Sequence, residues 1–345
     1  MRLARHLLVV ALLCALIAAP HAAAGAPPVT LVLATERGFP ITGSQEWYQL
    51  LTRLGVAGLQ IRSATGRDKP AVEKIGTKDA PHYAVTGILG ADGTLHVPGG
   101  RFTLRDDARI KRWLENLSDQ GVEGVTERRI AFGLLPKQLE AVNEDLKRPV
   151  GFTTRGVALR SAVERAGAGL EAPLVIDPAS SGAMENVLVA DELQELSRGT
   201  ALAIMLRPAG LVLQPERPAG GRLQYRVAAS RPGQEAWPTG WVAQQDKRRV
   251  LPALYELIDV EINGVPVAET LDALQQRLKV PFLFDHNALA MHNIDPRKVE
   301  AKLPAKRLTH SLILQRVLFQ ARLKWELRVD EAGKPLVWIT TLKPA

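Results

Sequence analysis

The stretch IDVEINGVPVAETLDALQQRLKVPFLFD, from Ile258 to Asp285, has a counterpart 108 positions earlier in the chain (258 − 150). That counterpart is VGFTTRGVALRSAVERAGAGLEAPLVID, from Val150 to Asp177. The two align without a gap and close on similar words, PFLFD and PLVID. Few residues are identical, but the apolar positions agree almost throughout. The chain therefore contains an internal repeat.

Each copy has the apolar pattern of a strand, a helix and a second strand. Ile258, Val260 and Ile262 alternate as in a half-buried strand, as do Val150 and Phe152 in the first copy. A glycine follows, and then apolar residues at steps of four, three and four, which form one stripe of an α-helix. These residues are Leu159, Val163, Ala166 and Leu170 in the first copy, and Val267, Leu271, Leu274 and Leu278 in the second. The unbroken apolar triplet in each closing word predicts a buried strand.

The alignment resumes after four inserted residues, at an offset of 112 (309 − 197). Ser197 and Thr309 stand where a second helix needs an N-cap, and we expect each hydroxyl to accept from free backbone amides. Both copies end in a candidate hairpin, from Leu211 to Ala229 around Ala219-Gly220-Gly221 and from Leu323 to Thr341. We predict an α+β protein with tandem β-α-β-β-α-β-type modules and small mixed sheets, preceded by a small α/β unit.

The second copy resembles the short N-terminal domain of secretins and TonB-dependent transducing receptors, abbreviated STN. The resemblance rests on VEINGVPVAETLDALQQRLKVPFLFD and KVEAKLPAKRLTHSLILQRVLFQARLKWELR, which follow the order of that domain's strands and helices. The first copy resembles a degenerate relative. The resemblance implies a non-catalytic periplasmic module that contacts other proteins, often in ring-shaped or membrane-spanning assemblies. In this chain the resemblance lies at the C-terminal end, whereas in secretins and receptors a barrel follows it.

The rest of the chain divides around these copies. We predict an N-terminal α/β unit of unknown function over 29–128, and a first STN-like repeat over 129–230 with a bridging helix from Pro136 to Leu146. A Pro- and Gly-rich linker follows over 231–249, and a second STN-like repeat over 250–345. In the N-terminal unit we expect strands at 29–34, 58–61 and 102–104, a hairpin over 83–97, a helix following Ser44 and a helix opened by Asp106-Asp107.

The first residues have the order of a secretory signal peptide. Arg2 and Arg5 precede an apolar run from Leu7 to Ala19, and small residues follow. This run is shorter than the roughly 20 residues that a membrane-spanning helix needs. We predict a signal peptide over 1–26, no transmembrane segment after its cleavage, and a periplasmic or otherwise extracytoplasmic location.

The single cysteine, Cys14, lies inside the predicted signal peptide. A lipoprotein anchored through Cys14 is the alternative, although Leu13 is larger than the residue expected before a lipidated cysteine. After cleavage the chain has no thiol for a disulfide, a nucleophile or a metal. The net charge of +8 is scattered in small groups, and export argues against nucleic acid as a partner.

Few residues suggest catalysis or metal binding. A set of possible metal ligands follows the second closing word: Asp285, His286, His292 and Asp295. Their spacing fits no known ligand pattern. The first copy also has an aspartate, Asp177, at the position of Asp285, but it has Pro178 at the position of His286. We therefore interpret this aspartate as part of the fold. Asp106-Asp107 is interpreted as a helix cap, and Ser180-Ser181 has no histidine near in sequence. We predict no cofactor.

Aromatic residues give the stronger functional signal. In the last hairpin, Leu336 and Trp338 fall on the face opposite the core, where an exposed pair suits a protein contact. The alternative is that they pack against the other repeat. Trp237 and Trp241 in the linker are candidate partner anchors or inter-domain staples. Open sheet edges in each repeat also suit strand addition by a partner.

We expect an exported, non-enzymatic protein-interaction module that docks onto a protein of the envelope or onto a second copy of itself. The alternative is an envelope enzyme, such as a hydrolase, with its site in the N-terminal unit and the repeats as targeting domains.

Overall fold

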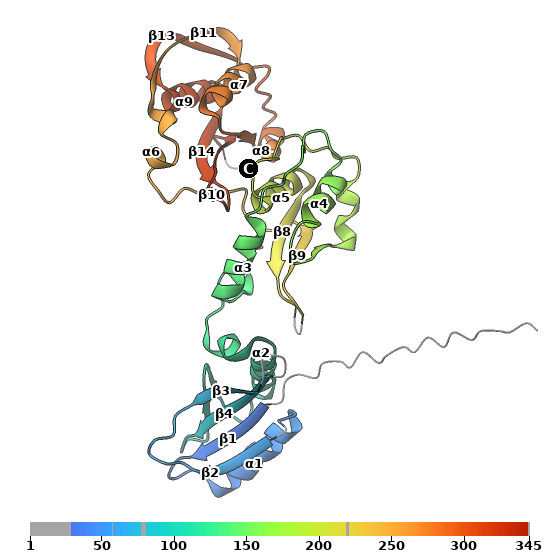
Figure 1. Cartoon of the computed structure of the whole chain (residues 1–345), viewed down its shortest axis with the longest axis vertical. Helices are drawn as coiled ribbons and strands as arrows, with labels where there is room; N and C mark the ends of the chain where they lie inside the picture. Colours follow the sequence, from blue (N-terminus) through green and yellow to red (C-terminus); the bar gives the residue numbers. More distant parts are fainter. Residues whose placement is uncertain (1–28, 57, 77–80, 219–220, 344–345) are drawn as a thin grey trace, which may run out of the picture. The chain divides into compact units, whose positions relative to one another are not determined.

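A computed structural model describes residues 29–343 except 57, 77–80 and 219–220. The predicted signal peptide, Cys14 and part of the predicted turn at Ala219-Gly220-Gly221 lie outside these residues. The chain divides after Glu127 into two compact units (Figure 1). The prediction of an α+β fold is confirmed, and the described strands form four small sheets.

The described part of the first unit has a six-stranded sheet and two helices. Its sheet has the order β2-β1-β4-β5-β6, and β3 pairs with β4. β1 runs parallel to β2 and β4, whereas β3, β5 and β6 pair antiparallel. The elements are β1 (Val29–Thr35), α1 (Ile41–Arg53), β2 (Gly58–Ser63), β3 (Ala71–Gly76), β4 (Pro81–Leu89), β5 (Leu95–Val97), β6 (Gly100–Phe102) and α2 (Asp107–Thr126).

Apolar residues from β1 and both helices form the core of this unit. Leu31 and Leu33 of β1 pack in one cluster with Trp47 of α1 and Ile110 of α2. The prediction that Ser44 precedes the helix is wrong, because α1 already begins at Ile41, after Pro40. Strand β3 was not expected, since its exposed Glu73-Lys74-Ile75 breaks the period-two alternation.

The first repeat begins with the bridging helix, which the structure has from Pro136 to Leu146, as the sequence predicts. Its elements are α3 (Pro136–Leu146), α4 (Leu159–Gly167), β7 (Leu174–Ile176), α5 (Arg198–Leu206), β8 (Leu211–Glu216) and β9 (Gln224–Ala229). The sheet order is β7-β9-β8, with β7 parallel and β8 antiparallel to β9. The connection to the second repeat includes β10 (Trp241–Val242) and α6 (Lys247–Val250).

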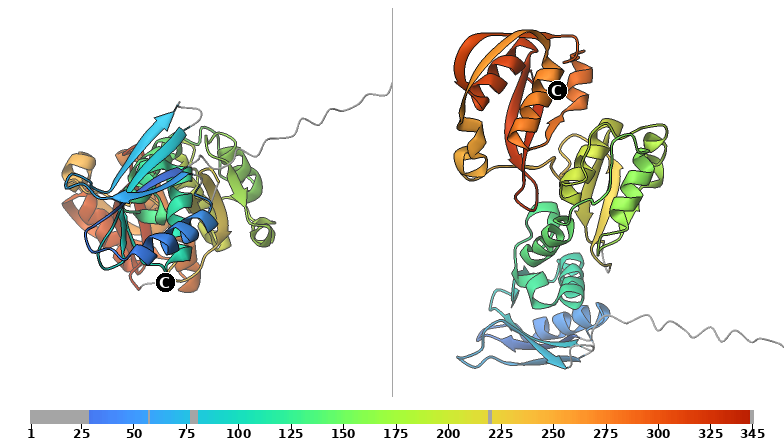
Figure 2. Two further views of the ribbon diagram at one scale, coloured as in Figure 1. Left: turned by 90° about the horizontal axis from the view of Figure 1, so that it is seen from below. Right: turned by 45° about the horizontal axis from the view of Figure 1, so that its top comes forward.

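The second repeat has its two long helices between two sheets (Figure 2). Helix α9 contacts β13 of one sheet and β14 of the other. The sheets have the orders β11-β13 and β10-β14-β15-β12. The elements are β11 (Leu257–Pro266), α7 (Val267–Leu278), β12 (Phe282–Phe284), α8 (His286–Met291), β13 (Glu300–Thr309), α9 (His310–Gln320), β14 (Leu323–Val329) and β15 (Pro335–Thr341).

The strand registers confirm that the two copies are one module. Leu174 pairs with Tyr225 in the first copy, and Phe282 pairs with Val337 in the second. These pairs are related by the offsets 108 (282 − 174) and 112 (337 − 225) of the sequence alignment. The helices α4 and α7 begin at equivalent residues, as do α5 and α9.

In the first repeat, only the two end pairs of the β11–β13 ribbon have equivalents among the described residues. Isolated bridges join Pro149 to Ser197 and Ala158 to Leu188. Their equivalents in the second copy are the first and last pairs of the ladder, Leu257 with Thr309 and Pro266 with Glu300. The strand predicted at Val150 and Phe152 is therefore wrong. Gly151 between them has a φ of 77°, which places it in the left-handed region and outside a strand.

Candidate functional site

The apolar pair of the last hairpin lies in the junction between the two repeats. Leu336 and Trp338 are 0% and 3% exposed, and both belong to the core cluster of the first repeat. The prediction that they are exposed is wrong, and the alternative, packing against the other repeat, is what the structure has. The Arg328 guanidinium lies 5.0 Å from the centre of the Trp338 ring and covers it. This pair therefore joins the repeats.

Trp237 is the second apolar element of the junction. It is 3% exposed and stacks on Phe132 at 5.7 Å between ring centroids. Its indole N–H donates to Glu331 Oε1 over 2.5 Å, so the linker is fixed to the tip of the last hairpin. Trp241 packs edge-on against Trp237 and remains 39% exposed. Trp237 is thus an inter-repeat staple, whereas Trp241 keeps one accessible side.

Two equivalent aspartates bind different arginines. Asp177 accepts a bidentate pair from Arg226 of its own sheet, at 2.8 Å. Asp285 accepts from Nε and Nη2 of Arg207, at 3.0 and 2.9 Å, and Arg207 belongs to the other repeat. The position equivalent to Arg226 in the second copy is Trp338. The second copy has therefore exchanged an internal ion pair for one across the junction.

The candidate metal ligands have separate partners. His286 Nε2 lies 2.8 Å from Asp191 Oδ2 of the first repeat, whereas Asp295 accepts from Arg297. The hydrogen bond to Asp191 raises the pKa of His286 above its ordinary value, against the opposing effect of burial. Within the described residues, no group of three or more His, Cys, Asp or Glu side chains is arranged to hold a metal ion.

The tip of the last hairpin brings two acidic residues into the first repeat. Asp330, 2% exposed, accepts from the backbone N–H of Ser197 at 2.9 Å. Glu331 accepts from the Thr200 hydroxyl and from Trp237, and burial raises the pKa of its carboxyl.

The expected cap by the Ser197 hydroxyl is absent, because Ser197 donates to the Lys147 carbonyl instead. Thr309 accepts from the Leu312 amide and caps α9 as predicted.

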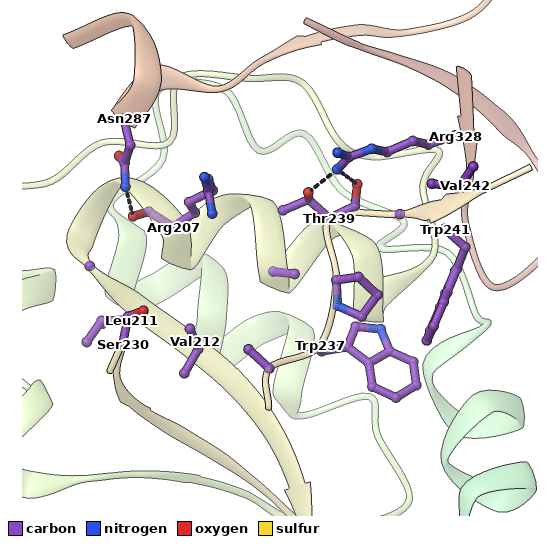
Figure 3. Close-up of a pocket in the computed structure, with 15 residues that line it drawn as sticks. Arg207, Leu211, Val212, Ser230, Trp237, Thr239, Trp241, Val242, Asn287 and Arg328 are labelled. Atoms are coloured by element: carbon purple, nitrogen blue, oxygen red, sulfur yellow. Dashed lines mark hydrogen bonds between the residues drawn. The ribbon is translucent and has the colours of Figure 1, made fainter. Parts of the chain in front are cut away.

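A pocket of about 480 Å³ opens at this junction. Figure 3 shows Arg207 and Asn287 on one side and Trp237, Trp241 and Arg328 on the other. The guanidinium of Arg207 binds Asp285, and that of Arg328 binds Glu326 and Thr239. Both cationic side chains are thus already neutralised by carboxylates of the protein. The pocket carries no group poised for acid–base or nucleophilic chemistry among its lining residues.

A second concave region lies along the outer edge of β11. A groove of about 320 Å³ runs between this strand and α7, with Ile262 and Ile313 in its floor. Glu261, Glu269 and Ala273 lie along it and are exposed. The first repeat has no equivalent strand, so the groove is a property of the second copy.

The other candidate residues, in Asp106-Asp107 and Ser180-Ser181, lie in surroundings typical of residues that stabilise the fold. Asp106 occupies the N-cap position of α2, but its carboxylate accepts from Thr103 and from the Arg109 side chain rather than from a backbone amide of the helix, so the predicted cap is absent. The Thr103 amide, which donates to this carboxylate, makes the largest contribution to lowering the pKa of Asp106 to about 2. Ser180 is buried, with a hydroxyl that has no hydrogen-bond partner, and the Ser181 carbonyl accepts from Arg160.

Asp145 in α3 is a buried residue that sequence reasoning missed. It is 5% exposed and accepts from the Tyr225 hydroxyl at 2.9 Å and from the amides of Glu171 and Ala172. Burial and this bond raise the pKa of Tyr225. In the sequence Asp145 lies in a polar stretch and carries no signal of burial.

No family model, curated protein or solved structure matches this chain. The resemblance to the STN domain therefore stays a prediction that rests on the sequence pattern.

Proposed function

We propose that this chain is an exported, non-enzymatic protein-interaction protein that docks onto another protein of the cell envelope through its tandem STN-like modules. The observation that carries the proposal is the exposed β11–β13 ribbon of the second repeat. Each of its strands has ten residues, and in the described part of the chain neither outer edge pairs with a strand. Exposed strand edges are common sites of protein contact.

The use of the acidic and aromatic side chains supports a non-enzymatic role. The ion pair between Arg207 and Asp285 and the hydrogen bonds of Glu331 fix one repeat to the other. Such groups are candidates for catalysis when they line a cleft with unsatisfied partners, but here their partners are protein groups.

No helix among the described residues is long and apolar enough to cross a bilayer.

Site-specific photo-crosslinking of the full chain in its own cells tests the proposal. A photoreactive residue replaces Leu257 or Phe319, which are 55% and 67% exposed in the second repeat. The matched control replaces Tyr48, 49% exposed in the first unit. We expect a discrete crosslinked protein from positions in the second repeat and none from Tyr48. Crosslinks only at Tyr48, or the same diffuse neighbours at all positions, would overturn the proposal.

A further inference from the structure

The two outer edges of the β11–β13 ribbon differ in how they are protected. On β13, the Gln320 side chain accepts from the Lys302 amide at 3.0 Å and donates to the Lys302 carbonyl at 3.2 Å. Pro304, two residues on, has no N–H to offer. These are two devices that prevent strand addition. The β13 edge is therefore closed along its middle.

Among the described residues, the edge of β11 has no proline and no side-chain hydrogen bond to its backbone between Leu257 and Val265, although register shifts between Val260 and Ile262 and between Asn263 and Val265 interrupt its pairing with β13. Thr270 donates to the Pro266 carbonyl, at the last residue of the strand. In an antiparallel pair, alternate residues direct their N–H and C=O groups to the outer edge. The register with β13 is regular from Leu257 to Val260, so alternate residues of this stretch present backbone donors and acceptors to the groove beside α7.

The groove has a lining that suits the side chains of an added strand. Its floor is apolar, with Leu274 and Ile313 at 5% and 1% exposure. On α7, Glu269, Ala273 and Arg277 lie one turn apart on the stripe that borders it. The small side chain of Ala273 keeps the middle of the groove open.

The charge at the groove is acidic. Asp259, Glu261 and Glu269 line it, against Arg277 alone. Arg307 stands opposite Asp259 in the ribbon, so three carboxylates face two guanidinium groups, and the groove keeps one excess negative charge (3 − 2) on the side of Glu261 and Glu269. A complementary partner carries positive charge.

We propose that an extended peptide segment, with lysine or arginine alternating with small apolar residues, binds as an added strand along the outer edge of β11. Its backbone pairs with β11, its apolar side chains enter the groove and its basic side chains meet Glu261 and Glu269. The inference rests on the proposed function and specifies where the docking occurs and what chemistry the docked segment has.

Fluorescence anisotropy with the full chain and defined peptides tests this site. The probe is a labelled peptide of about ten residues, the length of β11, with alternating lysine and valine. The first control replaces every lysine with glutamate, and the second carries N-methyl groups on the amides of one edge. We expect the lysine–valine probe to bind at least about tenfold more tightly than either control. Equal binding of all three peptides would overturn the proposal.

Matched variants of α7 locate the binding. Ala273→Trp fills the groove, whereas Gln276→Trp adds the same bulk at an exposed residue of α7 outside the lining. We expect the first to weaken probe binding about tenfold and the second to leave it unchanged. Glu269→Lys should likewise weaken binding, with Asp272→Lys, also exposed and outside the lining, as its control. Equal effects within each pair would contradict the site.

Two further outcomes separate the inference from the proposed function. If Ala273→Trp converts a dimer of the chain into a monomer in sedimentation, the occupant is a second copy and the basic segment is wrong. If the crosslinks at Phe319 persist in the Ala273→Trp variant and the unsubstituted chain does not bind the lysine–valine peptide, docking survives and the β11 site is wrong.

Discussion

At the scale of single residues, Asp177 and Asp285 illustrate how equivalent side chains acquire different tasks. The sequence repeat correctly indicated that this aspartate belongs to the fold, because both copies carry it. Its partners could not be predicted. Arg226 and Arg207 lie 49 and 78 residues away from their aspartates, and no local pattern marks either arginine. Spatial pairing of this kind is decided by tertiary packing.

The two arginines allow a matched comparison of stability. Arg207 and Arg226 are both 42% exposed, but the side chain of Asp285 is 6% exposed and that of Asp177 is 24% exposed. Arg207→Ala leaves a carboxylate that is nearly buried, and we expect a loss of about 2 kcal/mol in the free energy of unfolding. Arg226→Ala leaves a more hydrated carboxylate, so the expected loss is under about 1 kcal/mol. Urea denaturation of the full chain measures both values, and equal losses would contradict this assignment.

At the scale of elements, the helices were predicted more reliably than the strands. The stripe from Val267 to Leu278 follows directly from apolar spacing. The strand predicted at Val150 failed because a glycine in the left-handed region interrupts it. The exposed pair predicted at Leu336 and Trp338 failed for another reason. Alternation along a strand identifies two faces, but it does not reveal that a second domain covers the outer one.

A glycine near the end of β11 has an equivalent in the first copy. Gly156 and Gly264 have φ values of 78° and 70°, and Gly264 lies within an irregularity of the β11–β13 register. Gly264→Ala forces an alanine into the left-handed region, at an expected cost of about 1 kcal/mol. We expect faster amide hydrogen exchange in β11 and β13, measured by mass spectrometry.

Gly182 provides the control for this prediction. Its φ lies outside the left-handed region, and a Cβ added there meets no atom within 4 Å. Gly182→Ala should therefore leave exchange in the ribbon unchanged. Slower or unaltered exchange in Gly264→Ala would show that the ribbon does not depend on this conformation.

At the scale of the whole second unit, the junction between the repeats contains two groups with raised pKa values. The pKa of His286 is raised chiefly by its hydrogen bond to Asp191, and that of Glu331 is raised chiefly by burial. The contribution of His286 is complete below its unfolded pKa of about 6.5 and is lost as pH rises through the folded value. Burial disfavours the charged carboxylate of Glu331, so the folded state is also more stable at lower pH, where this carboxyl is protonated. Both groups therefore make the junction more stable on the acidic side.

We expect the free energy of unfolding of the second unit to fall as pH rises through and above about 6.5. His286→Gln keeps a polar side chain near Asp191 but cannot titrate, so the decline in this range should flatten. Asp295 in its surface ion pair with Arg297 offers a control, because Asp295→Asn should leave the slope unchanged. Denaturation series at several pH values give the slopes. A wild-type slope that survives in His286→Gln would refute the assignment.

The junction also limits how many modules can be stacked in this way. It is a head-to-tail contact, in which one face of the first repeat meets a different face of the second, and such contacts can in principle extend into a fibre. The equivalent faces outside the junction, one on each repeat, carry different residues. Phe319 stands where the first repeat has Arg207, and Arg226 stands where the second has Trp338. A copy added to the second repeat would meet Phe319 instead of an arginine for its aspartate, and a copy added to the first repeat would receive Arg226 instead of an indole in its core, so neither end can repeat this contact.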